Sequence, residues 1–244
     1  MIQGFYSAAS ALTAATQQQD LIAQNLAHGT VPGYRKRSLA FGAFEQALAG
    51  TTSSVQAPSR GGTQPSREYT SFQPGDYQQT GNSLELAVRG DGFFTLEGPE
   101  GPVYTRNGSF ELSATGQLQS TSGLPVSGTG GPITIPTGTS QIDIAKDGTV
   151  SANGAEVGQI RLAAFQDQNL LVRVGPTLFE APPEAALQQA QAQVLQGYRE
   201  GSNVAVVQEM VSLIVGSRHY EAATKALRAL ADALQQRTSP QATA

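Results

Sequence analysis

The chain has 244 residues, enough for one large domain or a modest domain with extensions. Only 14% of the residues are charged, so uncharged polar side chains must cover much of the surface. Such a surface suits subunits that press against copies of themselves, because few charges need desolvation. A net charge of −4 without a dense basic patch argues against nucleic-acid binding, and the absence of cysteine excludes disulfides and thiolate metal sites.

The first 28 residues are predicted to form a helix, with Gly29 and Pro32 as its stop signal. Apolar and small residues recur at alternating steps of three and four, the a/d seam of a coiled coil. That seam consists of Phe5, Ala8, Leu12, Ala15, Gln19, Ile22 and Leu26. Because it is rich in alanine, it buries little area per turn and needs a partner helix.

A second long helix is predicted over residues 204–236, and the tail after it is expected to fray around Pro240. Its seam consists of Val206, Met210, Leu213, Ser217, Tyr220, Thr224, Leu227, Ala231 and Leu234. One alternative is an ordinary amphipathic core helix. We favour mutual pairing of the two terminal helices, because a segment of different composition separates them.

Between the helices the pattern changes to that of short antiparallel strands, such as 93–96, 131–135, 141–145 and 159–165. Asp147 and Gly148 indicate a tight hairpin. The expected fold is therefore α+β, with N- and C-terminal long helices pairing as a coiled coil around a mainly antiparallel β domain. We expect six segments: helix and turn 1–34, polar linker 35–68, β-rich domain 69–181, a possibly helical connector 182–201, helix 202–237 and tail 238–244.

No catalytic or metal-binding constellation is recognisable, and no cofactor is expected. His28 and His219 lie near opposite ends, without the spacing of a zinc site. No nucleophile elbow or phosphate-binding loop is completed. The small basic cluster Arg35, Lys36 and Arg37 is interpreted as a solvated turn.

Several distinctive blocks of sequence follow one another along nearly the whole chain. The N-terminal block is 20–27 (DLIAQNLA) with Thr30, Gly33 and Tyr34. The central blocks are 90–94 (GDGFF), 104–110 (YTRNGSF), 116–118 (GQL) and 147–150 (DGTV). The C-terminal block is 197–200 (GYRE), 202–204 (SNV) and 218–221 (RHYE). Together and in this order, these blocks resemble the flagellar basal-body rod and hook family. His28 and Arg199 depart from the family's usual pattern, and the chain length favours a rod subunit, with the proximal rod preferred over the distal.

The resemblance implies a non-enzymatic subunit that polymerises through its terminal helices into the periplasm-spanning rod of the flagellar basal body and transmits torque. Its partners would be copies of itself, other rod and hook subunits, and the flagellar export apparatus. The sequence itself shows no cleavable signal peptide and no membrane span, so neither membrane insertion nor nucleic-acid binding is expected. The expected assembly interface comprises Phe5, Leu12, Ile22, Asn25, Leu26, Val206, Met210, Leu213, Tyr220, Leu227 and Leu234.

Two other classes of function stay open from the residues alone. One is a β-rich secreted binding or adhesion module with helical arms, for which the tripeptide Arg89-Gly90-Asp91 is the best argument. The other is a carbohydrate-active enzyme whose paired carboxylates are not marked by any motif.

Overall fold

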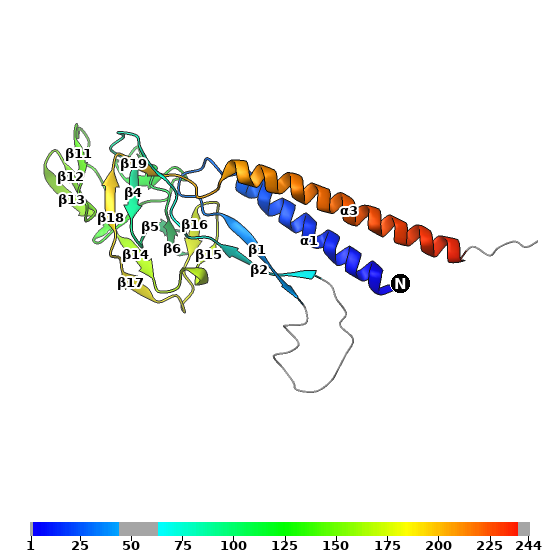
Figure 1. Ribbon diagram of the computed structural model, residues 1–244. Coiled ribbons are helices and arrows are strands. Elements are labelled where there is room, and N and C mark those ends of the chain that lie inside the picture. The colour runs from blue at the N-terminus through cyan, green and yellow to red at the C-terminus, as the bar shows by residue number, and fades with distance from the viewer. Residues whose placement is uncertain (1, 44–62, 239–244) are drawn as a thin grey trace, which may run out of the picture. The chain divides into compact units, whose positions relative to one another are not determined.

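The computed structural model describes residues 2–43 and 63–238, and these fall into two compact units (Figure 1). One unit draws on Met1–Ala27, Arg37–Ser71 and Ala205–Ala244, and the other on His28–Lys36 and Phe72–Val204. The predicted α+β class with mainly antiparallel strands is confirmed. The predicted linker between residues 44 and 62 and the predicted tail after Thr238 lie outside the described residues.

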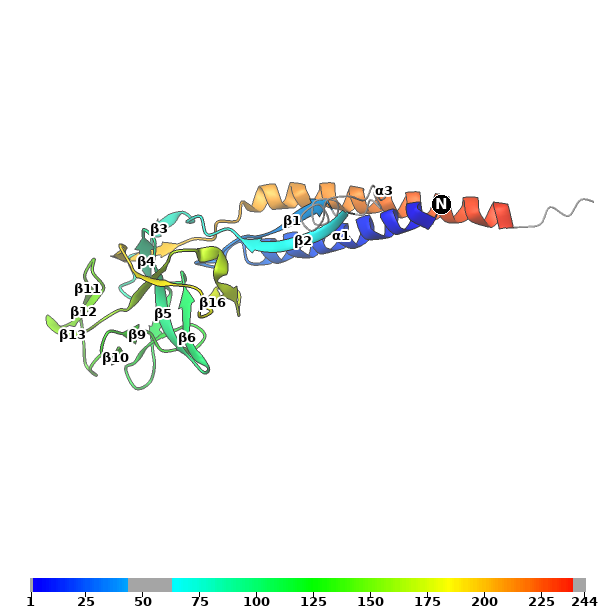
Figure 2. The same cartoon turned by 90° about the horizontal axis from the view of Figure 1, so that it is seen from below.

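The first unit, called here the helical unit, contains helices α1 (Ile2–Ala27) and α3 (Val206–Thr238). Both predicted helices are thus confirmed, and they lie side by side in Figures 1 and 2. Strands β1 (Arg37–Ala43) and β2 (Thr63–Thr70) pair antiparallel and lie against α1. Within residues 2–43 and 63–238, no helix is long and apolar enough to cross a membrane.

The prediction of a linker over residues 35–68 is wrong at both ends, where β1 and β2 form. The β2 segment (TQPSREYT) is polar and contains Pro65, and the β1 segment contains Gly42, features that are typical of loops. The two segments nevertheless pair in register with each other, with an irregularity between Ala40 and Phe41. Strand pairing satisfies the backbone whatever the side chains, so a polar composition does not exclude it.

The second unit, called here the β unit, is built around a six-stranded sheet in which every neighbouring pair is antiparallel. In spatial order its strands are β15 (Val172–Arg173), β16 (Leu178–Glu180), β6 (Gly101–Thr105), β5 (Phe93–Gly98), β14 (Leu162–Phe165) and β17 (Leu187–Gln189). A single turn of 3₁₀ helix, η1 (Gln168–Leu170), follows β14.

Smaller antiparallel groups complete the β unit. They are β3 (Tyr77–Gln79) with β19 (Tyr198–Glu200), β4 (Leu86–Arg89) with β18 (Gln193–Gln196), β7 (Phe110–Leu112) with β8 (Leu118–Ser120), β9 (Ser127–Gly128) with β10 (Gly131–Pro132), and β11 (Ile142–Ile144) with β12 (Thr149–Ala152) and β13 (Ala155–Gln159).

Two hydrophobic clusters form the core of the β unit. Successive side chains of a strand point to opposite faces, so Phe94 and Leu96 of β5 enter one cluster while Phe93 enters the other. The second cluster is strongly aromatic: Phe93 packs against Phe165 and Phe179 with ring centroids 5.9 and 6.2 Å apart. Phe94, Phe110 and Phe165 are likewise buried.

The predicted hairpin at Asp147 and Gly148 is confirmed by the pairing of β11 with β12. Gly148 has a φ of +88°, which glycine adopts without strain. The Asp147 carboxylate accepts a hydrogen bond from the Thr149 backbone N–H at 3.0 Å. That hydrogen bond holds the pKa of Asp147 below its ordinary range.

The helix considered for the connector at residues 182–201 does not form. This segment is rich in Ala, Gln and Leu, which favour helix in isolation. In the β unit it supplies β17 and β18, which pair with β14 and β4. Residues 182–201 are therefore part of the β unit rather than a connector, because long-range pairing overrides their local propensity.

Candidate assembly interface and signature cluster

The contact between α1 and α3 in the helical unit is made largely by small residues. A groove between them is lined by Ala11, Ala14, Ala15, Gln18, Val211, Ser212, Val215, Gly216, His219 and Ala223. At Gly216 a Cβ atom would stand 3.5 Å from Cγ of Gln19, an ordinary van der Waals distance. The two helices therefore approach closely while burying few large side chains.

The larger apolar residues near the start of α3 are exposed. We call Val207, Met210, Val211, Ile214 and Val215 the α3 apolar stripe. Their exposed fractions run from 46% for Val215 to 76% for Val207. The spacing i, i+3, i+4, i+7, i+8 places all five on one face of a helix. A contiguous exposed apolar patch of this kind marks a protein–protein contact.

The residues expected at the assembly interface differ in burial. Ile22 and Asn25 are buried, and Met210 and Tyr220 are exposed. Leu12, Leu26, Val206, Leu213 and Leu227 are half-buried, and the side chains of Phe5 and Leu234 are not among those described. The sequence missed Glu209, which is buried, and Gly216, which is half-buried.

Asn25, on the last turns of α1, is 1% exposed and fixes the start of β1. Its side-chain Nδ2 donates to the Arg37 carbonyl at 2.8 Å, and its Oδ1 accepts from the Arg37 backbone N–H at 2.9 Å. The amide thus replaces the partner that a neighbouring strand would provide. Arg37 in turn donates from Nη2 to Oε2 of Glu68 on β2 at 2.7 Å.

A buried Arg–Glu–Arg cluster lies in the β unit. Arg35 donates from Nη2 to Oε1 of Glu200 at 2.6 Å, and both side chains are 0% exposed. Arg106 Nη1 stands 3.6 Å from the other carboxylate oxygen of Glu200. The interpretation of Arg35 as part of a solvated turn is therefore wrong, because its side chain is fully buried. The carboxylate that pairs with it lies 165 positions further along the chain, where a local pattern cannot show it.

Backbone groups also bond the Arg–Glu–Arg cluster, which is called the signature cluster from here on. Arg106 donates to the carbonyls of Val88 and Gly90 at 3.1 and 2.9 Å, and its guanidinium lies 5.0 Å above the Phe93 ring. Burial lowers the pKa of Arg106 and the Glu200 carboxylate opposes that shift. Glu200 Oε1 also accepts from the Gly75 N–H at 3.2 Å. The cluster is thus a desolvated structural tie, since an arginine stays protonated in proteins.

The N- and C-terminal sequence blocks meet at this cluster. The Gly33 N–H donates to the Glu200 carbonyl at 2.9 Å, and Asn203 Oδ1 accepts from the Lys36 N–H at 2.7 Å. Gly33 has a φ of +69°, and a Cβ there would stand 2.3 Å from the backbone nitrogen of Asn107. Only glycine fits at this crossing of three blocks of sequence.

The described residues offer no catalytic arrangement around these groups. His28 stacks on Tyr34 with ring centroids 5.0 Å apart, and His219 borders the helix groove. Over residues 2–43 and 63–238, no group of three or more His, Asp or Glu side chains is arranged to hold a metal ion.

Two family models match the chain. The model described as the flagellar hook protein FlgE/F/G D1 domain matches residues 87–152, which lie in the β unit. The model described as the flagellar basal body rod FlgEFG protein C-terminal region matches residues 195–239, which include β19 and all of α3.

Curated relatives match along almost the entire length. The flagellar basal-body rod protein FlgF of Rhizobium meliloti is 32% identical, over 93% of each chain. The FlgF protein of Salmonella typhimurium is also 32% identical over 93% of each chain. The FlgG protein of Bacillus subtilis is 30% identical, over 97% of this chain and 98% of its own. The chain belongs to the family of flagellar basal-body rod proteins, which are structural subunits of the flagellum and not enzymes.

Proposed function

We propose that this chain polymerises through its two terminal helices, paired as a coiled coil, into a helical axial tube that transmits torque. The observation that carries the proposal is the α3 apolar stripe, whose five side chains are each nearly half exposed or more. Fully burying a side chain such as Val, Met or Ile contributes about 1.5–3 kcal/mol. A neighbouring subunit that covers the stripe would therefore gain several kcal/mol.

The two faces of α3 differ in side-chain size, and this difference supports the proposal. Small residues such as Gly216 face α1 and let the helices approach closely. The bulkier Val207 and Ile214, which do not line the groove with α1, stay available for another helix. Identical contacts repeated head to tail between copies, without closing into a ring, generate a helical filament. Of the residues expected at the interface, the exposed Met210 and Tyr220 are proposed to lie in these contacts. The buried Ile22 and Asn25 are proposed to support the helices from inside the subunit.

The proposed partners are copies of this chain and other rod and hook subunits. The proposed location is the part of the basal body that spans the periplasm, in the proximal rod, in keeping with the similarity to proteins named FlgF. We propose that residues 1–34 carry the address for the flagellar export apparatus. Deleting them would then trap the protein in the cytoplasm.

The adhesion interpretation is not supported. The relatives are named as rod proteins. Arg89, which opens the Arg-Gly-Asp tripeptide, is the last residue of β4, and Gly90 and Asp91 form the bend before β5.

Substitutions in the α3 apolar stripe test the proposed polymerisation. Ile214→Asp and Val211→Asp should abolish swimming and leave incomplete basal bodies in a deletion strain, since a carboxylate would be desolvated at the contact. Gln208→Asp, an exposed polar position on the same helix, is the matched control and should swim normally. Normal motility of both stripe variants, at normal protein levels, would rule the interface out.

A crosslinking experiment gives a readout that does not depend on motility. The chain contains no cysteine, so Ile214→Cys introduces a single thiol. We expect a short bifunctional thiol-to-amine reagent to join this residue to a neighbouring subunit in isolated basal bodies but not in dilute monomer.

A further inference from the structure

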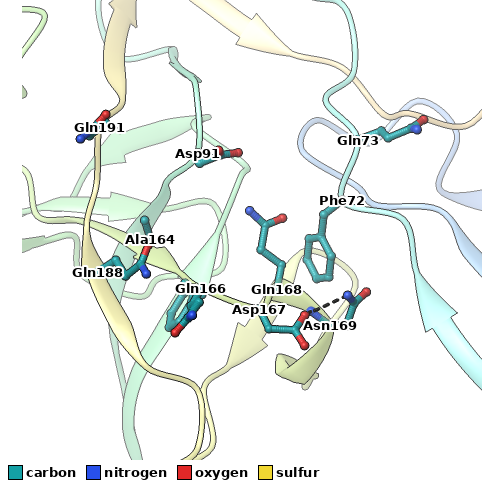
Figure 3. Close-up of a pocket in the computed structure, with 11 residues that line it drawn as sticks. Phe72, Gln73, Asp91, Ala164, Gln166, Asp167, Gln168, Asn169, Gln188 and Gln191 are labelled. Atoms are coloured by element: carbon teal, nitrogen blue, oxygen red, sulfur yellow. Dashed lines mark hydrogen bonds between the residues drawn. The ribbon is translucent and has the colours of Figure 1, made fainter.

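A polar hollow lies on the β unit, and neither Arg35, Arg106 nor Glu200 lines it (Figure 3). It is bordered by Phe72, by η1 and by the segment that contains the edge strand β17. Its volume is about 650 Å³, within the range of small-molecule sites in proteins. Neither the fold nor the proposed polymerisation through helices uses this hollow.

Amide side chains dominate the lining of the hollow. They belong to Gln73, Gln166, Gln168, Asn169, Gln188 and Gln191. Asp91 and Asp167 add two carboxylates, and no lysine or arginine lines the hollow. This electrostatic character disfavours phosphate and other anions. The polar lining equally disfavours an apolar ligand, so the matching ligand is neutral and rich in hydrogen-bonding groups.

Part of the site is held in place before any ligand arrives. The Phe72 ring packs against Phe179 and Phe93 with centroids 5.3 and 5.9 Å apart, so its position is fixed by buried neighbours. Asp167 Oδ1 accepts from both the backbone N–H and the side-chain Nδ2 of Asn169, each at 2.9 Å. A fixed ring and a fixed carboxamide lower the entropy cost of binding.

Other polar groups are ready to bond. Gln168 is half-buried, and Figure 3 shows its amide directed into the hollow. Across the part of the chain that the structure describes, the side chains of Gln166, Gln168 and Gln188 make no hydrogen bond. Each such amide can donate two hydrogen bonds and accept two at nearly the same place.

We propose that this hollow binds a neutral saccharide. Each hydroxyl group of a sugar both donates and accepts, so it can bond a glutamine amide through either its oxygen or its nitrogen. The C–H face of a sugar ring would lie on Phe72, and the Gln168 amide and the Asp167 carboxylate would bond its hydroxyls. The chemistry thus points to a short stretch of glycan, with no charge required for recognition.

The test uses dilute full-length protein and three soluble probes: maltotriose, cellotriose and tri-N-acetylchitotriose. Titration is followed by the backbone amide shifts of residues 166–169. At least one probe should bind saturably with a dissociation constant of roughly 0.1–1 mM, equivalent to about 4–5.5 kcal/mol. A sulfated trisaccharide should bind about tenfold more weakly, because Asp91 and Asp167 repel it.

Matched variants make the assignment specific. Gln168→Ala should weaken binding about tenfold or more without unfolding the protein, because its side chain makes no hydrogen bond in the described chain. Phe72→Leu should weaken binding similarly while keeping its apolar packing. Gln141→Ala, an exposed amide elsewhere in the β unit, should change nothing. Failure of all three sugars, an unaltered affinity in Gln168→Ala, or Gln168-dependent binding of an extended peptide alone would overturn the proposal.

Discussion

Arg35 and Glu200 form a fully buried ion pair at 2.6 Å although 165 positions separate them in the chain. One residue comes shortly after α1 and the other shortly before α3. The pair therefore joins the short segment His28–Lys36 of the β unit to the end of its long segment Phe72–Val204. Because Arg106 also faces Glu200, one carboxylate serves two buried guanidinium groups.

Glu200→Gln should destabilise the β unit strongly. The variant keeps the shape of the side chain but leaves Arg35 and Arg106 buried without a counter-charge. Removing one partner of a buried ion pair costs about 3–5 kcal/mol. The measurement is urea unfolding followed by the fluorescence of the chain's tyrosines.

The control for this experiment is Glu111→Gln. Glu111 is an exposed carboxylate of the same unit that accepts a hydrogen bond from Gln119. It should change the free energy of unfolding by less than about 0.5 kcal/mol. If Glu200→Gln were as mild as this control, the pair would not be the tie described here.

Asn25→Ala should loosen the junction of α1 and β1. It removes both hydrogen bonds to the Arg37 backbone and leaves a buried donor and acceptor, at a cost of about 1–3 kcal/mol. Hydrogen exchange at the Arg37 amide reports the effect directly.

Asn25→Asp separates the two hydrogen bonds. It keeps an oxygen to accept from the Arg37 N–H but cannot donate to the Arg37 carbonyl. We expect the Arg37 amide to stay protected in this variant and to lose protection in Asn25→Ala. Equal protection in both variants would assign the protection to β1–β2 pairing instead.

Local pattern predicted the elements whose cause is local. The two terminal helices, the turn at Asp147 and the alternation through Phe93 and Phe94 all depend on neighbours in the sequence. Strands β17 and β18 were not predicted, because the Ala- and Gln-rich segment that contains them favours a helix. Their partner strands lie about 25 and about 105 residues away in the sequence. The periodicity of apolar residues does not indicate which distant strands pair with each other.

The signature cluster shows the same limit. The blocks that contain Gly33, Arg106 and Glu200 are visible in the sequence, but their meeting point is not. Arg35 looked solvated because it stands in a run of three basic residues. Arg35 stands two positions after Gly33, a glycine that adopts a positive φ where the chain passes close to Asn107. This short spacing is the signal that could have suggested a buried Arg35.

Tyr77 should make stability sensitive to alkali. Burial and then the Glu200 carboxylate raise the pKa of Tyr77 above its ordinary value near 10.0. The folded state therefore favours the neutral phenol, and this contribution is full below pH 10 and is lost as the pH rises through the higher folded-state pKa. Tyr77→Phe should flatten the decline in stability above pH 10.

The same variant has a separate cost at neutral pH. The Tyr77 hydroxyl donates to the Val88 carbonyl at 3.0 Å, so Tyr77→Phe should lose about 1 kcal/mol there. Unfolding measured at pH 7 and above pH 10 separates the two effects. An unchanged alkaline decline in Tyr77→Phe would assign that sensitivity to other groups, such as Tyr104, whose pKa burial also raises.

Gly216→Ala should stabilise the helical unit, whereas Gly33→Ala should disrupt the β unit. Gly216 lies inside α3, and its new Cβ would make an ordinary contact with Gln19. Alanine is better than glycine in a helix by about 1 kcal/mol. At Gly33 the positive φ and the backbone of Asn107 leave no room. Thermal unfolding should show opposite shifts, and a loss of stability in Gly216→Ala would mean that α1 and α3 are closer than described.

The terminal helices should be less protected than the β unit in dilute monomer. Their mutual contact relies on residues such as Ala14 and Gly216, and each buried CH₂ contributes only about 0.8 kcal/mol. Fixing the backbone of one residue costs roughly 1–2 kcal/mol. Hydrogen exchange should therefore be faster throughout α3 than in β5, and it should slow in assembled rods, where a neighbour covers Val211 and Ile214. Gly216→Ala should slow exchange in the monomer only partly, because the α3 apolar stripe stays uncovered. If α1 and α3 exchange as slowly as β5 in the monomer, the two helices already hold a sufficient core, and assembly does not order them.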